Sequence, residues 1–289
     1  MRIRIVSPAS ALNPLLIDGA AQRLSSWGHE VSIAPHAKDR FGQFAGTTNA
    51  RKQDLMEALA DPMVDAILCA RGGYGVMQLI DDELMKALNQ GKLILGFSDI
   101  TCLHNMLAQQ NIPSVHSIMA KHIATLPDDS EPIVTLRNIL NGGNVNYSFP
   151  TDSNSRRGKA KGILRGGNLA VLLGMQGTPY QLKTENGILF LEDVGEAHYR
   201  VERMLQNLRL AGVFEQVKGV IYGNFTGTDN DPRMNQTVQE MLLSYTENYS
   251  YPVICNFSAG HIDNNLPLIL NTETEIDIQE QTTSITQKR

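Results

Sequence analysis

The first 125 residues alternate short strand-like runs with amphipathic segments, and this alternation restricts the fold more than any other feature of the chain. Four runs predict strands, at 3–6, 29–34, 64–70 and 93–96. Segments with helical spacing lie between them, at 15–27, 51–59 and 81–88. Strands separated by helices of this length predict a doubly wound α/β domain, in which helices cover both faces of a parallel sheet.

The chain changes character between about residues 126 and 161. The stretches "LPDDSEP" and "PTDSNSRRGKAKG" are rich in residues typical of connections rather than packed elements. Beyond them lie three strand-like runs, "GILFLEDVGE", "VKGVIYGNFTG" and "YPVICNFSAGH", and an amphipathic helix at about 199–210. We therefore expect an N-terminal domain over 1–125, a linker over 126–161 and a C-terminal domain over 162–289. The last residues, "TTSITQKR", are expected to be unstructured.

The composition argues against several classes of protein. Twenty-five basic and thirty acidic side chains give a net charge of −5, spread along the chain. Phosphate binding needs clustered Lys and Arg, so no nucleic-acid partner is expected. No signal peptide and no membrane-spanning run of about 18 apolar residues is expected either.

The three cysteines, Cys69, Cys102 and Cys255, lie far apart in apolar surroundings. This predicts buried reduced thiols and a cytoplasmic protein. Neither CxxC nor HExxH occurs, so no metal site is expected.

Polar or glycine-rich stretches follow four predicted strands. They are "RGGYG" after Ala70, "GFSD" after Leu95, "LED" after Phe190 and "SAGH" after Asn256. Ligands of parallel sheets gather where the strands end, so these stretches are the candidates for a functional site.

Ser98, in "GFSD", has two interpretations. It is a good N-cap for the helix that follows. It also fits a nucleophile elbow, a tight turn with small neighbours that lifts a hydroxyl above the sheet. Gly96 supplies one glycine of the GxSxG pattern, but Ile100 stands in place of the second. The residues alone leave both interpretations open.

A serine nucleophile needs a base, and a histidine base needs an acid. His116 and His261 each end a strand-like run, and the tight "SAGH" loop favours His261. The other five histidines fit packing or surface positions: His29, His36, His104, His122 and His198. Glu192 is the first charge at the tip of an apolar strand, whereas Asp193 beside it fits a helix cap. Physical reasoning leaves the choice between these two acids open.

An oxyanion would need backbone donors. Gly72 and Gly73 form a turn that a substrate can approach closely, and the amide of Asp99 follows the candidate nucleophile directly. A phosphate-binding loop is the alternative, although the GxGxxG spacing and the P-loop lysine are absent. Arg71, beside this turn, is suited to hold a carboxylate through two parallel hydrogen bonds, or lies on the surface.

Six stretches together resemble the LD-carboxypeptidases, bacterial serine peptidases whose family includes the microcin C self-immunity proteins. They are "PAS" at 8–10, "ARGGYG" at 70–75, "GFSDIT" at 96–101, "RGGNLAVL" at 165–172, "LEDVGEAHYRVERML" at 191–205 and "SAGH" at 258–261. The resemblance implies a triad of Ser98, Glu192 and His261, with an oxyanion hole from the Asp99 amide and the Gly73 region. It also implies a homodimer without a metal or cofactor, whose subunits add a smaller β-rich α/β domain to the doubly wound one.

The resemblance further implies a cytoplasmic enzyme of peptidoglycan recycling that releases the terminal D-alanine from murein tetrapeptide. Substrate contacts are then expected from Arg71, Gly72 and His116. Two alternatives stay open. The same triad could hydrolyse aminoacyl-nucleotide antibiotics of the microcin C type. The chain could instead be a non-catalytic α/β protein that binds a nucleotide or a peptide.

Overall fold

The computed structural model describes residues 1–228 and 230–288 and divides the chain into two compact units. Unit 1 comprises Met1–Gly143 and Leu266–Leu270, and unit 2 comprises Asn144–Asn265 and the residues from Asn271 onward. The division at Gly143 falls inside the predicted linker. The return of 266–270 to unit 1 has no local sequence signal, because it depends on pairing with a strand far away in the chain.

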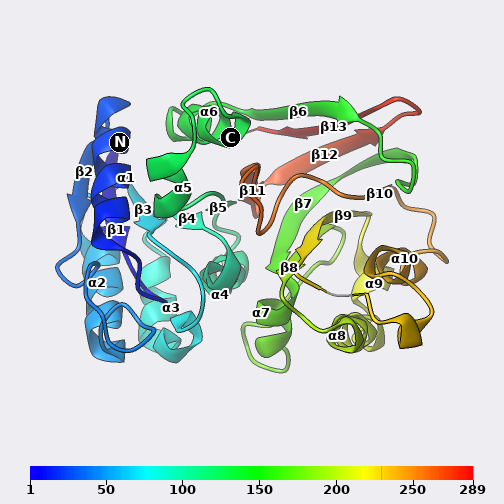
Figure 1. Cartoon of the computed structure of the whole chain (residues 1–289), viewed down its shortest axis with the longest axis horizontal. Helices are drawn as coiled ribbons and strands as arrows, with labels where there is room; N and C mark the ends of the chain where they lie inside the picture. Colours follow the sequence, from blue (N-terminus) through cyan, green and yellow to red (C-terminus); the bar gives the residue numbers. More distant parts are fainter. Residues whose placement is uncertain (229, 289) are drawn as a thin grey trace. The chain divides into compact units, whose positions relative to one another are not determined.

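Unit 1 contains a six-stranded sheet in the order β11-β5-β4-β3-β1-β2 (Figure 1). Its strands are β1 (Arg2–Val6), β2 (Glu30–Ile33), β3 (Ala66–Cys69), β4 (Leu93–Gly96), β5 (Ser114–His116) and β11 (Leu268–Leu270). All neighbours pair in parallel except β11, which runs antiparallel to β5. The predicted doubly wound parallel sheet is confirmed.

Helices cover this sheet. They are α1 (Pro14–Ser26), α2 (Thr48–Ala60), α3 (Asp82–Leu88), α4 (Thr101–Ala108), α5 (Ala120–Thr125) and α6 (Glu131–Leu140), with the short 3-10 helices η1 (Val76–Leu79) and η2 (Ser98–Ile100). Helix α1 packs against α5, and α2 packs against α3. Because both faces of the sheet are covered, every residue of β3 is buried, which explains its uninterrupted apolar sequence.

Unit 2 contains a seven-stranded mixed sheet in the order β10-β9-β8-β7-β12-β13-β6. Its strands are β6 (Val145–Pro150), β7 (Gly158–Asn168), β8 (Ile188–Val194), β9 (Gly219–Thr226), β10 (Val253–Ile254), β12 (Glu273–Ile278) and β13 (Thr282–Gln287). Strands β7 to β10 are parallel, and β12, β13 and β6 extend the sheet from β7 in antiparallel pairs. The expected second α/β domain, rich in strands, is confirmed.

The helices of unit 2 are α7 (Leu169–Gly174), α8 (His198–Leu210), α9 (Val213–Gln216) and α10 (Val238–Ser244), together with the 3-10 helix η3 (Pro232–Met234). Apolar side chains of α8, α9 and α10 form one buried cluster with those of β8 and β9. Within the described residues, no helix of either unit has both the length and the hydrophobicity to cross a bilayer.

Two expectations about irregular segments are wrong. The predicted linker, 126–161, contains α6, β6 and the start of β7, and the tail expected to be unstructured forms β13. In β13, residues at alternate positions are buried, but the inward side chains include Thr283 and Gln287. Gln287 is satisfied by donating from Nε2 to Thr274 Oγ1 at 2.8 Å. A strand with polar residues on both faces lacks the apolar alternation by which strands are recognised.

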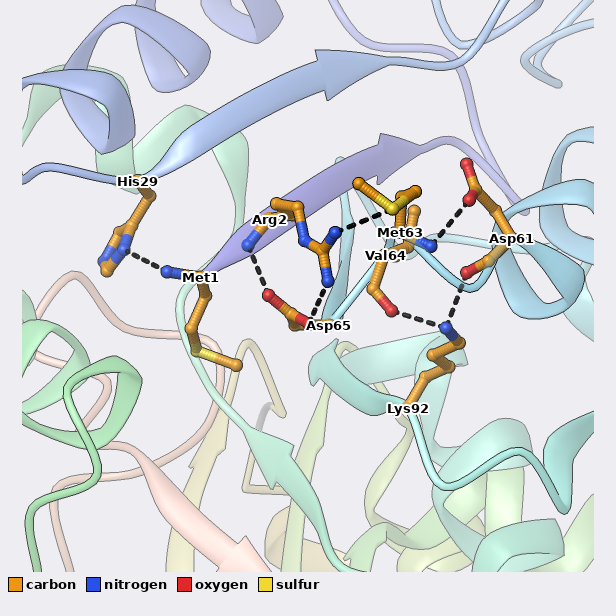
Figure 2. Close-up of polar contacts among 8 residues, drawn as sticks. All are labelled: Met1, Arg2, His29, Asp61, Met63, Val64, Asp65 and Lys92. Atoms are coloured by element: carbon orange, nitrogen blue, oxygen red, sulfur yellow. Dashed lines mark hydrogen bonds and ion pairs between the residues drawn. The ribbon is translucent and has the colours of Figure 1, made fainter.

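Charged side chains fasten the amino ends of the strands in unit 1 (Figure 2). The Asp65 carboxylate, just before β3, accepts from the backbone N–H of Arg2 at 2.7 Å and from its guanidinium at 3.2 Å. These bonds hold the pKa of Asp65 below its usual range. Lys92, just before β4, donates from Nζ to the carbonyls of Asp61 and Val64 at 2.6 and 2.5 Å. Polar contacts thus stabilise the amino-terminal ends of β1, β3 and β4, opposite the strand ends that Ser98 follows.

We predict that Lys92→Met lowers the free energy of unfolding by about 2 kcal/mol, because two partly buried carbonyls lose their donor. Urea unfolding measures the change. Lys121→Met, at an exposed position of α5, serves as the control. An equal loss in the two variants would show that the Lys92 contacts add nothing to stability.

Candidate active site

Ser98 lies where β4 gives way to η2, and its backbone is left-handed, with φ of 65°. The other non-glycine residues at positive φ in the described chain are all asparagines. This conformation costs an ordinary L-residue roughly 1–2 kcal/mol, so the surrounding structure must enforce it. Ser98 is not the N-cap, because Phe97 occupies that position and caps with no side-chain bond. The cap interpretation is therefore wrong, and the geometry is that of an elbow.

Two glycines make this turn possible. A Cβ at Gly96, whose φ is 157°, would lie 2.9 Å from the side chain of Ile100. A Cβ at Gly72 would lie 2.7 Å from Ser98 Cβ. Both distances are too short for a side chain, so positions 72 and 96 require glycine. Ile100 stands where the GxSxG pattern has its second glycine, and its side chain packs closely against Gly96.

The loop after β3 is fitted tightly around Ser10. Gly73 has φ of 99°, and a Cβ there would lie 2.4 Å from Ser10 Oγ. The same hydroxyl accepts from the backbone N–H of Tyr74 at 3.2 Å, and Ser10 N donates to the Gly72 carbonyl. Gly72 and Gly73 of "RGGYG" thus allow close packing against Ser98 and Ser10.

A buried arginine fixes the far end of this loop. Arg51 of α2 is 1% exposed and donates to the carbonyls of Pro8 and Gly75 at 2.6 and 2.9 Å. The Asp99 carboxylate accepts from the N–H of Val76 at 2.8 Å. Burial raises the pKa of Asp99, while this bond and the positive charge of Arg51 oppose the shift. Sequence reasoning missed Arg51, because a charged residue in an amphipathic helix is ordinarily a surface residue.

Two expected substrate contacts fall in different surroundings. The exposed guanidinium of Arg71 donates to the Ala11 carbonyl at 2.7 Å. His116 is completely buried, and its ring lies 5.6 Å from that of Phe97, the residue before Ser98. The expectation that His116 contacts a substrate is therefore corrected. It is a core residue that packs behind the turn.

In unit 2, Glu192 and His261 form a hydrogen-bonded pair. Glu192 Oε2 lies 2.8 Å from His261 Nδ1, the carboxylate is fully buried, and the imidazole is 19% exposed. This bond places the proton of a neutral ring on Nδ1, which leaves Nε2 as the basic nitrogen. A Cβ at Gly260 would lie 3.0 Å from Glu192 Oε2, so a side chain there would crowd the carboxylate.

The pairing of β8 with β9 is irregular at Glu192. Leu191 pairs with Tyr222, but Asp193 pairs with Phe225, so β9 carries an extra residue opposite Glu192. Gly223, in this bulge, would place a Cβ 3.2 Å from Glu192 Cβ. Bulges of this kind re-aim side chains beside functional sites.

The two neighbouring acids, Glu192 and Asp193, have different hydrogen-bond partners. Asp193 accepts from the N–H of Ala170 at 2.9 Å, from Asn168 Nδ2 at 3.0 Å and from the N–H of Val194 at 2.8 Å. It therefore secures the start of α7, while Glu192 is the acid that meets His261. Burial raises the pKa of Asp193 to about 6, with a further contribution from the charge of Glu192.

Ser98 thus lies in unit 1 with Gly72, Gly73, Arg71 and the Asp99 amide, and Glu192 and His261 lie in unit 2. Across residues 1–228 and 230–288, no three His, Cys, Asp or Glu side chains are grouped in a way that could hold a metal ion.

We predict that Arg51→Met lowers the free energy of unfolding by roughly 3 kcal/mol, because the Pro8 and Gly75 carbonyls lose a buried charged donor. Hydrogen exchange at the Val76 amide should also speed up. Arg40→Met, at an exposed position, is the control. Unchanged stability and exchange in Arg51→Met would mean that the loop holds its shape without the guanidinium.

Asp193 gives a pH prediction. Its folded pKa, about 6, lies above the reference value of 3.8, so folding takes up a proton between these values. The stability that Asp193 contributes is therefore present below pH 3.8 and lost as the pH rises through about 6. We expect the thermal midpoint of Asp193→Asn to be lower than that of wild type at every pH, because Asn keeps only one of the two oxygens that accept hydrogen bonds. Between pH 3.8 and about 6, however, its midpoint should fall less than that of wild type. Parallel pH profiles in scanning fluorimetry would contradict the shifted pKa.

Comparisons with known proteins find relatives along nearly the whole chain. The family model described as LD-carboxypeptidase N-terminal domain matches residues 3–117, and the LD-carboxypeptidase C-terminal domain matches residues 161–276. A Synechocystis protein provisionally named a carboxypeptidase is 35% identical over 278 residues, which cover 96% of this chain and 91% of that protein. The murein tetrapeptide carboxypeptidase of Pseudomonas aeruginosa is 29% identical over 272 residues, covering 90% of this chain and 88% of that one.

Solved structures share the whole fold. A muramoyltetrapeptide carboxypeptidase from Oxalobacter formigenes superposes with a TM-score of 0.90 at 25% identity, covering 100% of this chain and 99% of that one. The protein MccF, solved in complex with glutamyl sulfamoyl guanosine, gives 0.85 at 23% identity over 99% of this chain and 95% of its own. At that identity the likeness to MccF concerns the fold alone. Since the two family models together span most of the chain, it belongs to the LD-carboxypeptidase family of peptidases.

Proposed function

We propose that this chain is a serine peptidase that releases the terminal D-alanine from murein tetrapeptide, with Ser98, His261 and Glu192 as its triad. The observation that carries the proposal is the Glu192–His261 hydrogen bond of 2.8 Å, in which a buried carboxylate orients a partly exposed imidazole. The enforced left-handed turn at Ser98 supports it from the other unit.

In the proposed reaction, His261 Nε2 removes the proton of Ser98 Oγ, which attacks the carbonyl that precedes the terminal D-alanine. The backbone amides of Asp99 and Gly73 hold the resulting oxyanion, and losing one such donor costs roughly 3–4 kcal/mol of barrier. The imidazolium then protonates the leaving amine, D-alanine departs, and an acyl group stays on Ser98. A water molecule, deprotonated by His261, hydrolyses this ester and restores the serine. Glu192 stabilises the imidazolium in both halves of the cycle.

The proposed substrate rests on relatives and on the residues around Ser98. Relatives named murein tetrapeptide carboxypeptidase and muramoyltetrapeptide carboxypeptidase match over nearly the whole chain. Arg71 is exposed and keeps donors beyond the one given to Ala11, so it suits the terminal carboxylate. The absence of a side chain at Gly72 lets the loop after β3 approach Ser98 closely, since a Cβ there would lie 3.1 Å from the Ser98 hydroxyl oxygen.

We predict that Ser98→Ala lowers D-alanine release from murein tetrapeptide by about three orders of magnitude or more. The thermal midpoint should change little, because the substitution removes one oxygen atom. Mass spectrometry of a defined tetrapeptide measures release, and Ser25→Ala, exposed on α1, is the control. Full D-alanine release by Ser98→Ala would end the triad proposal, whereas no release by wild type would leave a binding protein as the better account.

The same assay, run with a second candidate substrate, distinguishes peptidoglycan cleavage from antibiotic hydrolysis. MccF, which shares the fold, was solved with an aminoacyl sulfamoyl nucleoside bound. Cleavage of an aminoacyl sulfamoyl-adenosine, with murein tetrapeptide left intact, would assign the same triad to antibiotic hydrolysis instead.

A further inference from the structure

The side chain of Asn265 closes the loop that carries His261, and the proposed mechanism gives it no role. Asn265 Oδ1 accepts a hydrogen bond from the backbone N–H of Gly260 at 2.9 Å. Asn265 is completely buried, and Gly260 is buried as well. A buried N–H that lost its acceptor would be costly, so this bond fixes the position of the Gly260 amide.

The peptide group between Ala259 and Gly260 is held at both of its polar atoms. Its N–H donates to Asn265, and its carbonyl oxygen accepts from the N–H of Asn224 at 2.8 Å. Asn224 belongs to the bulge of β9 opposite Glu192. The peptide group is therefore fixed to a strand on one side and to an asparagine side chain on the other.

This peptide group lies directly beside the acid of the Glu192–His261 pair. Gly260 has φ of 128°, and a Cβ there would lie 3.0 Å from Glu192 Oε2 and 3.2 Å from Glu192 Cβ. Glycine adopts many other backbone conformations at little cost, so Gly260 alone cannot hold the loop against the carboxylate. His261 is the next residue, and its Nδ1 lies 2.8 Å from the same oxygen. The bond from Asn265 thus constrains the backbone from which the imidazole reaches Glu192.

We propose that Asn265 is a positioning residue for the candidate base, an inference that rests on the proposed function. By holding the Gly260 amide, Asn265 keeps the His261 ring in its hydrogen bond with Glu192. In this role it acts through the backbone, so its loss should slow turnover and leave substrate affinity almost unchanged. A residue that merely stabilised the fold would lower the thermal midpoint when substituted and leave turnover by the folded enzyme as it was.

The Glu192–His261 hydrogen bond can be observed without catalysis. In ¹H NMR of the full chain, an imidazole N–H bonded to a carboxylate gives a resonance far downfield of the backbone amides, and the one that His261→Gln lacks belongs to this pair. Asn265→Leu fills the space of the amide group without supplying an acceptor. We expect it to remove this resonance and to speed amide hydrogen exchange over 258–262 about tenfold or more. Asn265→Ala is the second variant, for use if Asn265→Leu does not fold.

Turnover of murein tetrapeptide provides the second measurement. We expect Asn265→Leu to lower kcat about tenfold or more, because a displacement of about 1 Å in a catalytic geometry can cost about a hundredfold in rate. KM should change by less than about twofold. A fall in kcat with KM preserved is what the loss of a positioning contact produces, since the substrate still binds but reacts slowly.

Gln287→Leu is the matched control for lost stability. Gln287, buried on β13, donates from Nε2 to Thr274 Oγ1 at 2.8 Å, and β13 is separated from β8 by β7 and β12. This variant also loses a buried hydrogen bond, so we expect a lower thermal midpoint, with kcat, KM and the downfield resonance unchanged.

The outcomes distinguish the role of Asn265 from the proposed function. If wild type cleaves no tetrapeptide, the proposed function fails, and the resonance and hydrogen exchange still decide whether Asn265 positions the ring. The inference is overturned if the Asn265 variants keep the downfield resonance or keep full kcat. It is also overturned if Gln287→Leu loses as much kcat as Asn265→Leu, because the effect would then follow from stability alone.

Discussion

The backbone of Ser98 is held in a left-handed conformation by close packing against two glycines and by polar contacts that fix the neighbouring loop. The close approaches at Gly72 and Gly96 leave no space for side chains. Arg51 and Asp99 then hold the loop that contains Gly72 from its far end, through the Gly75 carbonyl and the Val76 amide. Local strain of this kind persists only where neighbouring contacts over-determine it, and it concentrates at functional sites.

Unit 2 shows how environment gives adjacent acids different roles. Glu192 and Asp193 are both buried, yet Asp193 accepts hydrogen bonds from Asn168 and Ala170 at the start of α7 and from the neighbouring Val194 amide. Glu192 meets the ring of His261, and its Oε1 has no hydrogen-bond partner within the described chain. A buried carboxylate with so few donors interacts most favourably with a positive ring, which is what the proposed base needs when it holds the serine proton.

Sequence reasoning recovered strands β1 to β4 of unit 1. Strands β3 and β4 are apolar throughout because helices cover both faces of their sheet, and this pattern is visible locally. Strand β13 was missed because its polar residues hide the alternation, and β11 because its pairing with β5 is a long-range contact. Strand β6 was missed although its sequence alternates, because it lies between the polar stretches that were assigned to a linker.

In the candidate site, too, the features that the sequence did not predict depend on contacts between residues distant in the chain. The residue types and chain order indicated Ser98 and His261, but two adjacent acids at a strand end differ only in what surrounds them. His116 was expected at the substrate, since nothing in "IPSVH" reveals that the ring packs against Phe97. Arg51 was missed because its contacts, with Pro8 and Gly75, come from residues distant in the sequence.

The central claim is that one hydroxyl, one imidazole and one carboxylate act as a single relay. A crystal structure of the protein after reaction with a fluorophosphonate tests it most directly. The account predicts phosphorus bonded to Oγ of Ser98, with Nε2 of His261 within about 3.2 Å of that oxygen. An adduct on another residue, or a ring at position 261 well beyond hydrogen-bonding distance, would contradict it.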